Sequence, residues 1–367
     1  MKNKTRQIYL TIFLLLTLLS LQAQDNTYKS SGILSLKYGK GYIYPHHQCV
    51  KYLTKGYTTV TELNWSMRTN GKKAWHYYYK RPVLGLALSY RDLANPEILG
   101  KSYAFSPFMQ FYLIETRPFS LRLKTAIGVS VLSKKFDIDK NIHNILIGSH
   151  ANAYIHLNLD IDIRLAPGIS AIIGGGVAHY SNGHMKPPNK GVNIFELQSG
   201  LRYTFSEKPK PVSPPENKPF RASNELSLQY CGGMKKVRPG KYKDYYTSII
   251  GINFERRITP LHRFGIGINF FSDHSVRNPY ISYAMQPPQN YYAGGTHLSY
   301  AIVFNQFEIG MQMGMFFYKT HKYSEFIYQR YAIIYRFGKY WMAQTGLKTY
   351  WGSADFMFVG LGCRIPL

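Results

Sequence analysis

A histidine and a serine stand two residues apart near the middle of the chain. His179 and Ser181 end an expected strand, Gly168–Asn182, and a loop rich in Pro, Asn and Gly follows from Gly183 to Gly191. Because side chains alternate along a strand, both residues are predicted to point to the same face. An imidazole beside a hydroxyl can take its proton and make the oxygen a nucleophile, so the pair indicates a hydrolase.

The next expected strand, Asn193–Phe205, brings a third polar side chain back towards this pair. Asn193 could hold the tautomer of His179 through its amide oxygen, although an amide lacks the charge that stabilises an imidazolium. Glu196 is the nearest carboxylate and is the alternative for this role. Its position three residues further on predicts that it lies on the opposite face of the strand.

Six residues of this region resemble the motif of the outer-membrane lipid A 3-O-deacylase (PagL-like, acyloxyacyl hydrolase) family, namely His179, Ser181, Asn182, Pro188, Asn189 and Gly191. Members carry His-x-Ser-Asn, a loop that ends in Pro-Asn-x-Gly, and a Glu two residues after that Gly. This chain has Asn193 where the family usually has the Glu. The resemblance covers residues 30 to 205.

The resemblance implies a serine esterase that acts on lipid A of lipopolysaccharide. Ser181 would attack an acyl ester, His179 would take its proton and return it to the leaving hydroxyl, and Asn182 would donate into an oxyanion hole. Three basic loop residues are candidates for binding the glucosamine phosphates, namely His184, Lys186 and Lys190. No cofactor is implied, and no ligand cluster stands at the spacing of a metal site.

The start of the chain predicts export. Residues 1–23 combine a basic start, an apolar run from Ile8 to Leu21 and a plausible cleavage site after Ala23, which is typical of a signal peptide. No later apolar run is long enough for a membrane-spanning helix. A membrane protein with this sequence would therefore be a barrel, in the outer membrane of a Gram-negative bacterium.

Composition also favours an all-β, antiparallel transmembrane barrel. The chain has 16% aromatic residues, 32 Tyr and 31 Gly, and many segments alternate apolar with polar residues. Its net charge is +26, of which the signal peptide contributes three positive charges and no acid, which leaves +23. This charge suits a phosphate-rich partner such as lipopolysaccharide, and a secreted chain without a nucleic-acid-binding module argues against DNA or RNA.

Residues 24–205 are expected to form a deacylase-like barrel of about eight strands: Gly32–Lys40, Tyr57–Arg68, Pro82–Arg91, Ser102–Glu115, Phe119–Leu132, Ile145–Ile163, Gly168–Asn182 and Asn193–Phe205. Long and short connections mostly alternate, and outer-membrane barrels have long outer loops and short periplasmic turns. This pattern places the N-terminus of the barrel in the periplasm and His179 and Ser181 at the outer end, where lipid A is found.

Residues 206–221 are predicted to be a Pro-rich linker, and 222–367 a second barrel-like unit with strands between Ser223 and Pro366. Weak similarities in the same order suggest an internal repeat in which Thr349 and Trp351 replace His179 and Ser181. The sequence leaves open two small barrels or one large barrel, although the linker favours two. It also leaves an alternative function, a non-catalytic porin or surface-binding barrel with a decayed motif.

Overall fold

A computed structural model describes residues 32–46, 48–71, 73–205, 220–237, 243–278, 290–319 and 325–367. The predicted signal peptide lies outside the described residues, as does the predicted linker from residue 206 to residue 219.

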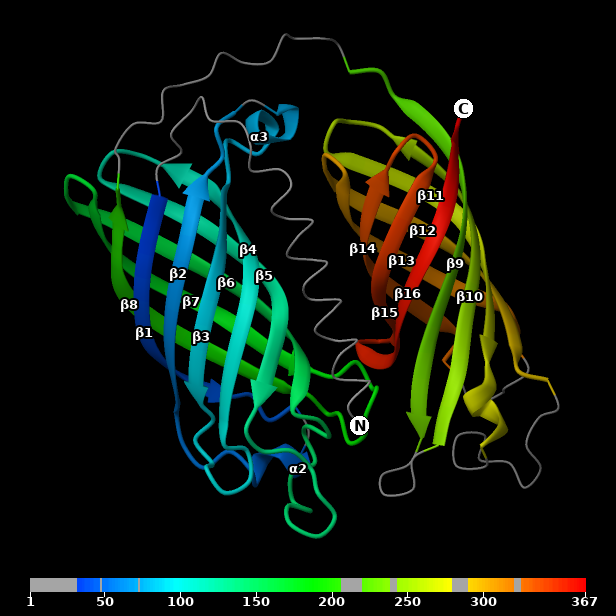
Figure 1. Ribbon diagram of the computed structural model, residues 1–367, viewed down its shortest axis with the longest axis horizontal. Helices are drawn as coiled ribbons and strands as arrows, with labels where there is room; N and C mark the ends of the chain where they lie inside the picture. The colour runs from blue at the N-terminus through cyan, green and yellow to red at the C-terminus, as the bar shows by residue number, and fades with distance from the viewer. Residues whose placement is uncertain are drawn as a thin grey trace.

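The first half of the chain forms a closed antiparallel barrel of eight strands, in sequence order around the barrel (Figure 1). Its strands are β1 (Gly32–Ile43), β2 (Thr58–Arg68), β3 (Val83–Asp92), β4 (Lys101–Glu115), β5 (Phe119–Leu132), β6 (Ala151–Ala166), β7 (Ile169–Ser181) and β8 (Val192–Thr204). Pairing of β1 with β8, in which Gly39 lies opposite Gln198, closes the barrel. The expected antiparallel barrel is confirmed.

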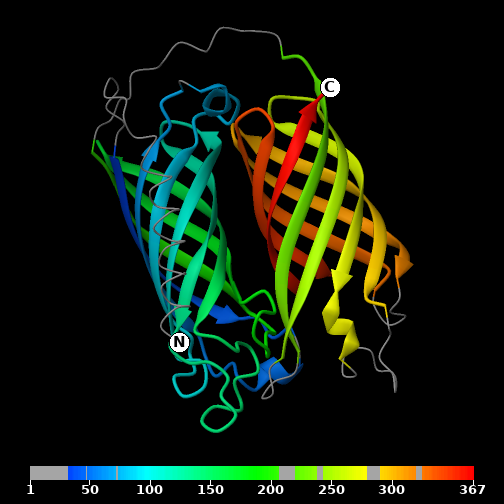
Figure 2. The same ribbon diagram turned by 45° about the vertical axis from the view of Figure 1, so that its right-hand side comes forward.

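The second half forms a separate closed barrel, so the chain has two eight-stranded barrels rather than one large barrel. Its strands are β9 (Ser223–Val237), β10 (Lys243–Arg257), β11 (His262–Asp273), β12 (Tyr292–Phe304), β13 (Phe307–Lys319), β14 (Ile327–Phe337), β15 (Trp341–Tyr350) and β16 (Ser353–Pro366). The two barrels stand side by side in both views (Figures 1 and 2).

Helical segments are few and short in the part of the chain that the structure describes. They are α2 (Gln48–Lys51), α3 (Ala74–Tyr78) and the 3-10 helix η1 (His274–Arg277). Helix α3 occupies the connection between β2 and β3. In the described ranges, no helix has the length and apolar character needed to cross a membrane.

One predicted strand begins too early. The sixth strand was expected from Ile145, but β6 begins at Ala151. The side chains of Leu146 and Ile147 are fully buried within the outer loops, and the Leu146 carbonyl accepts a hydrogen bond from Gly191 N–H at 3.1 Å. The apolar run at 145–147 therefore covers the outer end of the barrel instead of extending its wall.

The barrel wall separates an apolar outside from a polar inside, as β6 illustrates. Leu157, Leu159 and Ile161 are exposed on the outside, whereas His156 and Asp160 are buried inside. A strand between lipid and a polar interior shows this period of two.

Charged side chains fill the interior of the first barrel. Two nitrogens of Arg91 each donate to a carboxylate oxygen of Glu196 at 2.9 Å, and His156 Nε2 lies 2.9 Å from the same carboxylate. Nearby, Lys124 Nζ lies 2.7 Å from Glu62 Oε1 and Lys37 Nζ lies 3.0 Å from it. Opposite charges therefore lie next to one another in this buried interior, which a buried charge requires.

We expect replacement Glu196→Gln to lower the free energy of unfolding by about 3–5 kcal/mol, because it leaves the Arg91 charge buried without a counter-charge. The matched control is Glu115→Gln, which removes a carboxylate that pairs with Arg68 at 2.6 Å but is 45% exposed. Such a surface pair is worth about 0–1 kcal/mol. Urea unfolding of both variants in lipid vesicles measures how much free energy of unfolding each one loses. Equal losses in the two variants would contradict a stabilising charge network in the barrel interior.

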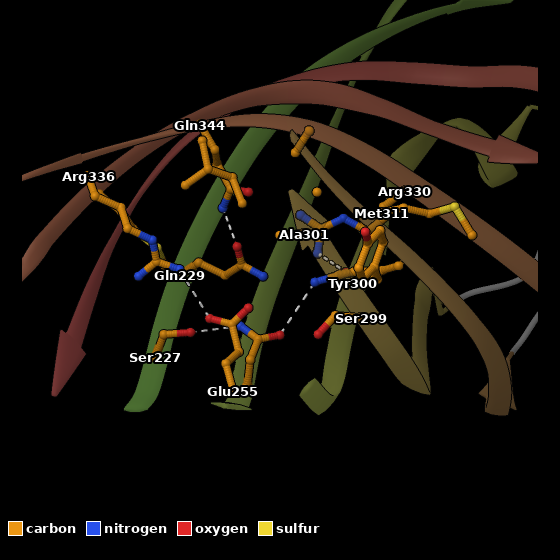
Figure 3. A pocket seen from close by; sticks show the side chains of 16 residues that line it. Ser227, Gln229, Glu255, Ser299, Tyr300, Ala301, Met311, Arg330, Arg336 and Gln344 are labelled. Atoms are coloured by element: carbon orange, nitrogen blue, oxygen red, sulfur yellow. Dashed lines mark hydrogen bonds and ion pairs between the residues drawn. The ribbon is translucent and has the colours of Figure 1, made fainter. Parts of the chain in front are cut away.

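The second barrel is also filled. A cavity that the described residues enclose in its interior has a volume of about 30 Å³, room for only a few water molecules. Side chains from strands that are not paired with one another meet at this cavity, where Gln344 donates to Gln229 and Arg336 pairs with Glu255 (Figure 3). The polar interior is therefore packed rather than open at this cavity.

Candidate active site

His179 and Ser181 lie on the outside of the first barrel, near the outer end of β7. The residues between and beside them, Ala178 and Tyr180, are fully buried inside the barrel. His179 and Ser181 are half-buried on the opposite, lipid-facing side of the strand. Pairing of β7 with β8 places Asn193 directly across from His179.

The ring of His179 is held by Asn193. Nδ1 of His179 lies 2.6 Å from the amide oxygen of Asn193, so Nδ1–H donates to that oxygen. In a neutral imidazole, this arrangement leaves the other ring nitrogen, Nε2, without a proton. His179 is therefore presented in the tautomer that can accept a proton.

His46 lies behind Asn193. Its Nδ1 lies 3.4 Å from Nδ2 of Asn193, and its ring contacts the carbonyl oxygens of Tyr44 at 3.1 Å and Lys190 at 2.9 Å. The ring thus connects the end of β1 to the loop that follows β7.

Two donors converge on the oxygen of Ser181. Oγ accepts hydrogen bonds from Nδ2 of Asn189 at 2.9 Å and from the backbone N–H of Gly183 at 3.1 Å. Among the described residues, no hydrogen bond joins the side chains of Ser181 and His179. Because Oγ accepts both bonds, its own proton remains available for donation to a base.

Asn182 does not face Ser181, which corrects its expected role as an oxyanion donor. Its side chain is 1% exposed and donates to Ser149 Oγ at 2.9 Å and to the Lys186 carbonyl at 2.7 Å. Adjacent strand residues point to opposite faces, so Asn182 points inward and ties two outer loops together. Its backbone N–H is bound by the Asn189 side chain at 3.0 Å.

Glu196 does not approach His179, so the alternative that this carboxylate orients the histidine is wrong. It is 4% exposed inside the barrel, where it binds Arg91 and His156. The odd number of residues from Asn193 to Glu196 along β8 accounts for the difference in face. Asn193 alone of these two contacts the histidine.

The three basic loop residues differ in their surroundings. Lys190 is exposed, and Lys186 is half-buried. Burial lowers the pKa of Lys186, and the nearby charges of Lys135 and Lys236 lower it further. Burial also lowers the pKa of His184, which makes this imidazole uncharged near neutral pH and less suited to bind phosphate.

From the sequence alone, no role is assigned to three residues of the site, His46, Gly183 and Asn189. Asn189 belongs to the recognised motif, and that motif was a signal for it. The backbone donor of Gly183 carries no side-chain signal. His46 lies far away in sequence and reaches the site because β1 pairs with β8.

Two protein families match the chain. Residues 59–202 match the family described as lipid A 3-O-deacylase (PagL), and residues 224–366 match the family described as acyloxyacyl hydrolase, C-terminal domain. The comparison with curated proteins found no significant match.

Two solved structures are similar to one barrel. The crystal structure of the outer membrane enzyme PagL is 18% identical with a TM-score of 0.34, and the match covers 45% of this chain and 97% of that chain. Neisserial surface protein A (NspA) is 14% identical with a TM-score of 0.32, over 47% of this chain and 97% of that chain. The two family matches together span more than half of the chain, and the first includes His179, Ser181 and Asn193. The protein therefore belongs to the lipid A 3-O-deacylase (PagL) family of the outer membrane.

Proposed function

We propose that the protein is an esterase that removes an acyl chain from lipid A, with Ser181 as nucleophile and His179 as general base. The observation that carries this proposal is the hydrogen bond of 2.6 Å between His179 Nδ1 and Asn193 Oδ1, on the same outer face as Ser181. This bond orients a base on the face of β7 that carries the hydroxyl, and in acyl transfer the base would come within hydrogen-bond reach of that hydroxyl.

In the first step, Oγ of Ser181 forms a bond to the ester carbonyl carbon while its proton passes to Nε2 of His179. The bond between the carbonyl carbon and the sugar oxygen then breaks, and His179 returns the proton to the leaving hydroxyl. Water, activated by the same imidazole, hydrolyses the acyl-serine and restores the enzyme.

The negative oxygen that forms in the first step needs donors that are already in place. Gly183 N–H and Asn189 Nδ2 converge on Ser181 Oγ and lie beside the point of attack. We assign these two groups, in place of Asn182, to the stabilisation of this oxygen. As the bond from Oγ to the carbonyl carbon forms, both donors would shift their hydrogen bonds from Oγ to the neighbouring negative oxygen.

The position of the site on the outer wall supports a lipid substrate. A lipid in the surrounding leaflet reaches His179 and Ser181 from the side, without entering the barrel. We assign Lys186 and Lys190 of the adjacent loop to the glucosamine phosphates, because lysine binds phosphate with charge-assisted bonds.

A pore is the competing function for a barrel, and the packing of both interiors argues against it. Ion pairs around Glu62 and Glu196 occupy the first barrel, and the cavity of the second barrel is about 30 Å³. Barrels of eight strands are just wide enough for side chains to fill them.

The test is the mass of lipid A after incubation with purified protein in outer-membrane lipid vesicles. We expect wild type to release one hydroxyacyl chain and Ser181→Ala to release none. Ser199→Ala, on the outer face of the neighbouring strand, is the matched control and should behave as wild type. Unchanged lipid A with folded wild type would refute the proposal, and conductance in planar bilayers would then indicate a pore.

A further inference from the structure

The turn that carries the nucleophile touches the second barrel. A methyl group built on Gly183 would overlap Cγ of Met357, and it would lie 2.6 Å from Sδ of Met357 and 3.5 Å from Cδ1 of Leu347. Met357 on β16 and Leu347 on β15 lie opposite one another in the strand pairing. These two side chains form one apolar contact surface for Gly183.

This contact is local to the site. Met357 is half-buried, whereas Val359 and Leu361, on the same outer face of β16, are 67% and 62% exposed. The outer connection between β15 and β16 is the short turn Trp351–Gly352, which lies beside the loop after β7 in Figure 1. A short turn leaves room for that loop of the first barrel against the wall of the second.

The two barrels also meet at their other ends. The ring of Tyr79, next to α3, stacks on Phe304 of β12 with ring centroids 4.8 Å apart, and its hydroxyl donates to the Val303 carbonyl at 3.4 Å. Contacts at both ends hold the second barrel in place beside the first. Met357 is therefore a fixed neighbour of Gly183.

Charge interactions also connect the loop with the second barrel. Besides burial, the positive charge of Lys235 on β9 lowers the pKa of His184, while the negative charge of Asp355 on β16 raises it. Both residues belong to the second barrel. The residue after Gly183 thus faces the same wall.

We propose that the second barrel acts as a support for the active site, with Met357 as a positioning residue for the Ser181 turn. Gly183 has a φ of +61°, and its N–H donates to Ser181 Oγ at 3.1 Å. Met357 blocks outward movement of Gly183 and so fixes this donor. The inference rests on the proposed function, and it gives the second barrel a role in the reaction.

The experiment compares steady-state deacylation by Met357→Ala, Met357→Leu and Val359→Ala in the full-length protein. Because a misplaced reacting group can cost up to about 10²-fold in rate, we expect Met357→Ala to lower kcat by about 10- to 10²-fold with little change in KM. Met357→Leu should restore most of the rate, and Val359→Ala should match wild type. Equal rates for Met357→Ala and Val359→Ala would overturn the proposal.

A double-mutant cycle isolates the contact itself. Gly183→Ala is strained at positive φ in any background, but its methyl group overlaps Met357 only when that side chain is present. We therefore expect Gly183→Ala/Met357→Ala to be more active than the two single effects combined predict. Strict additivity would count against the support role.

A cross-link separates failure of this inference from failure of the proposed function. Gly183→Cys/Met357→Cys should form a disulfide on mild oxidation with copper phenanthroline, seen as a faster band on a non-reducing denaturing gel, whether or not the protein is active. Gly183→Cys/Val359→Cys is the control pair. Absence of the cross-link in the folded Gly183→Cys/Met357→Cys variant would refute the contact. A cross-link in this variant, together with no deacylation by the wild-type protein, would refute only the esterase function.

Discussion

Replacement of His179 by alanine should lower kcat for lipid A deacylation by at least about 10⁴-fold while KM changes little, because histidine in a Ser-His site acts only in the chemical steps. Without the imidazole, the proton of Ser181 loses the base that we propose accepts it, and the leaving hydroxyl loses the same group as its donor. The measurement is the steady-state rate of acyl release from lipid A in vesicles.

The control for this variant is His143→Ala, which removes an exposed histidine from another outer loop. It should keep the wild-type rate. Loss of a general base should lower kcat by about 10⁴-fold. If His179→Ala retains more than about a tenth of wild-type kcat, His179 is therefore not the base.

Replacement Asn193→Asp should raise kcat by about 10- to 10³-fold. Asn193 already holds the correct tautomer of His179 through a bond of 2.6 Å, so the new carboxylate changes the charge rather than the geometry. An adjacent opposite charge shifts a pKa by about 1–3 units in favour of the charged form, here the imidazolium that forms in the transition state.

Asn193→Ala is the matched comparison, because it removes the orienting oxygen without adding charge. It should be slower than wild type, which gives the order Asp, Asn, Ala from fastest to slowest. An Asp variant that folds but is no faster than wild type would show that Asn193 does not face the imidazolium during the reaction.

Much of the fold could be predicted from local pattern. Alternation along β6 separated His156 and Asp160 from Leu157 and Leu159, because a barrel wall has lipid on one side and a polar interior on the other. The same period predicted that His179 and Ser181 share a face and that Glu196 lies on the other. These predictions needed only the geometry of a single strand.

The features that sequence reasoning missed depend on contacts between distant segments. The sequence predicts a strand at Leu146 and Ile147, because residues buried under the outer loops are as apolar as residues of a barrel wall. His46 reaches Asn193 only because the barrel closes between β1 and β8. The contact of Met357 with Gly183 depends on how one barrel docks against the other, and neither residue carries a sign of it in sequence.

The most direct test of the central claim is covalent labelling with a long-chain alkyl fluorophosphonate, followed by peptide mass analysis. The account predicts that Ser181 Oγ displaces fluoride and forms a bond to phosphorus in wild type, with its proton passing to His179, and that His179→Ala is not labelled. Deacylation of lipid A by a wild-type protein that is labelled at another serine, or at none, would contradict it.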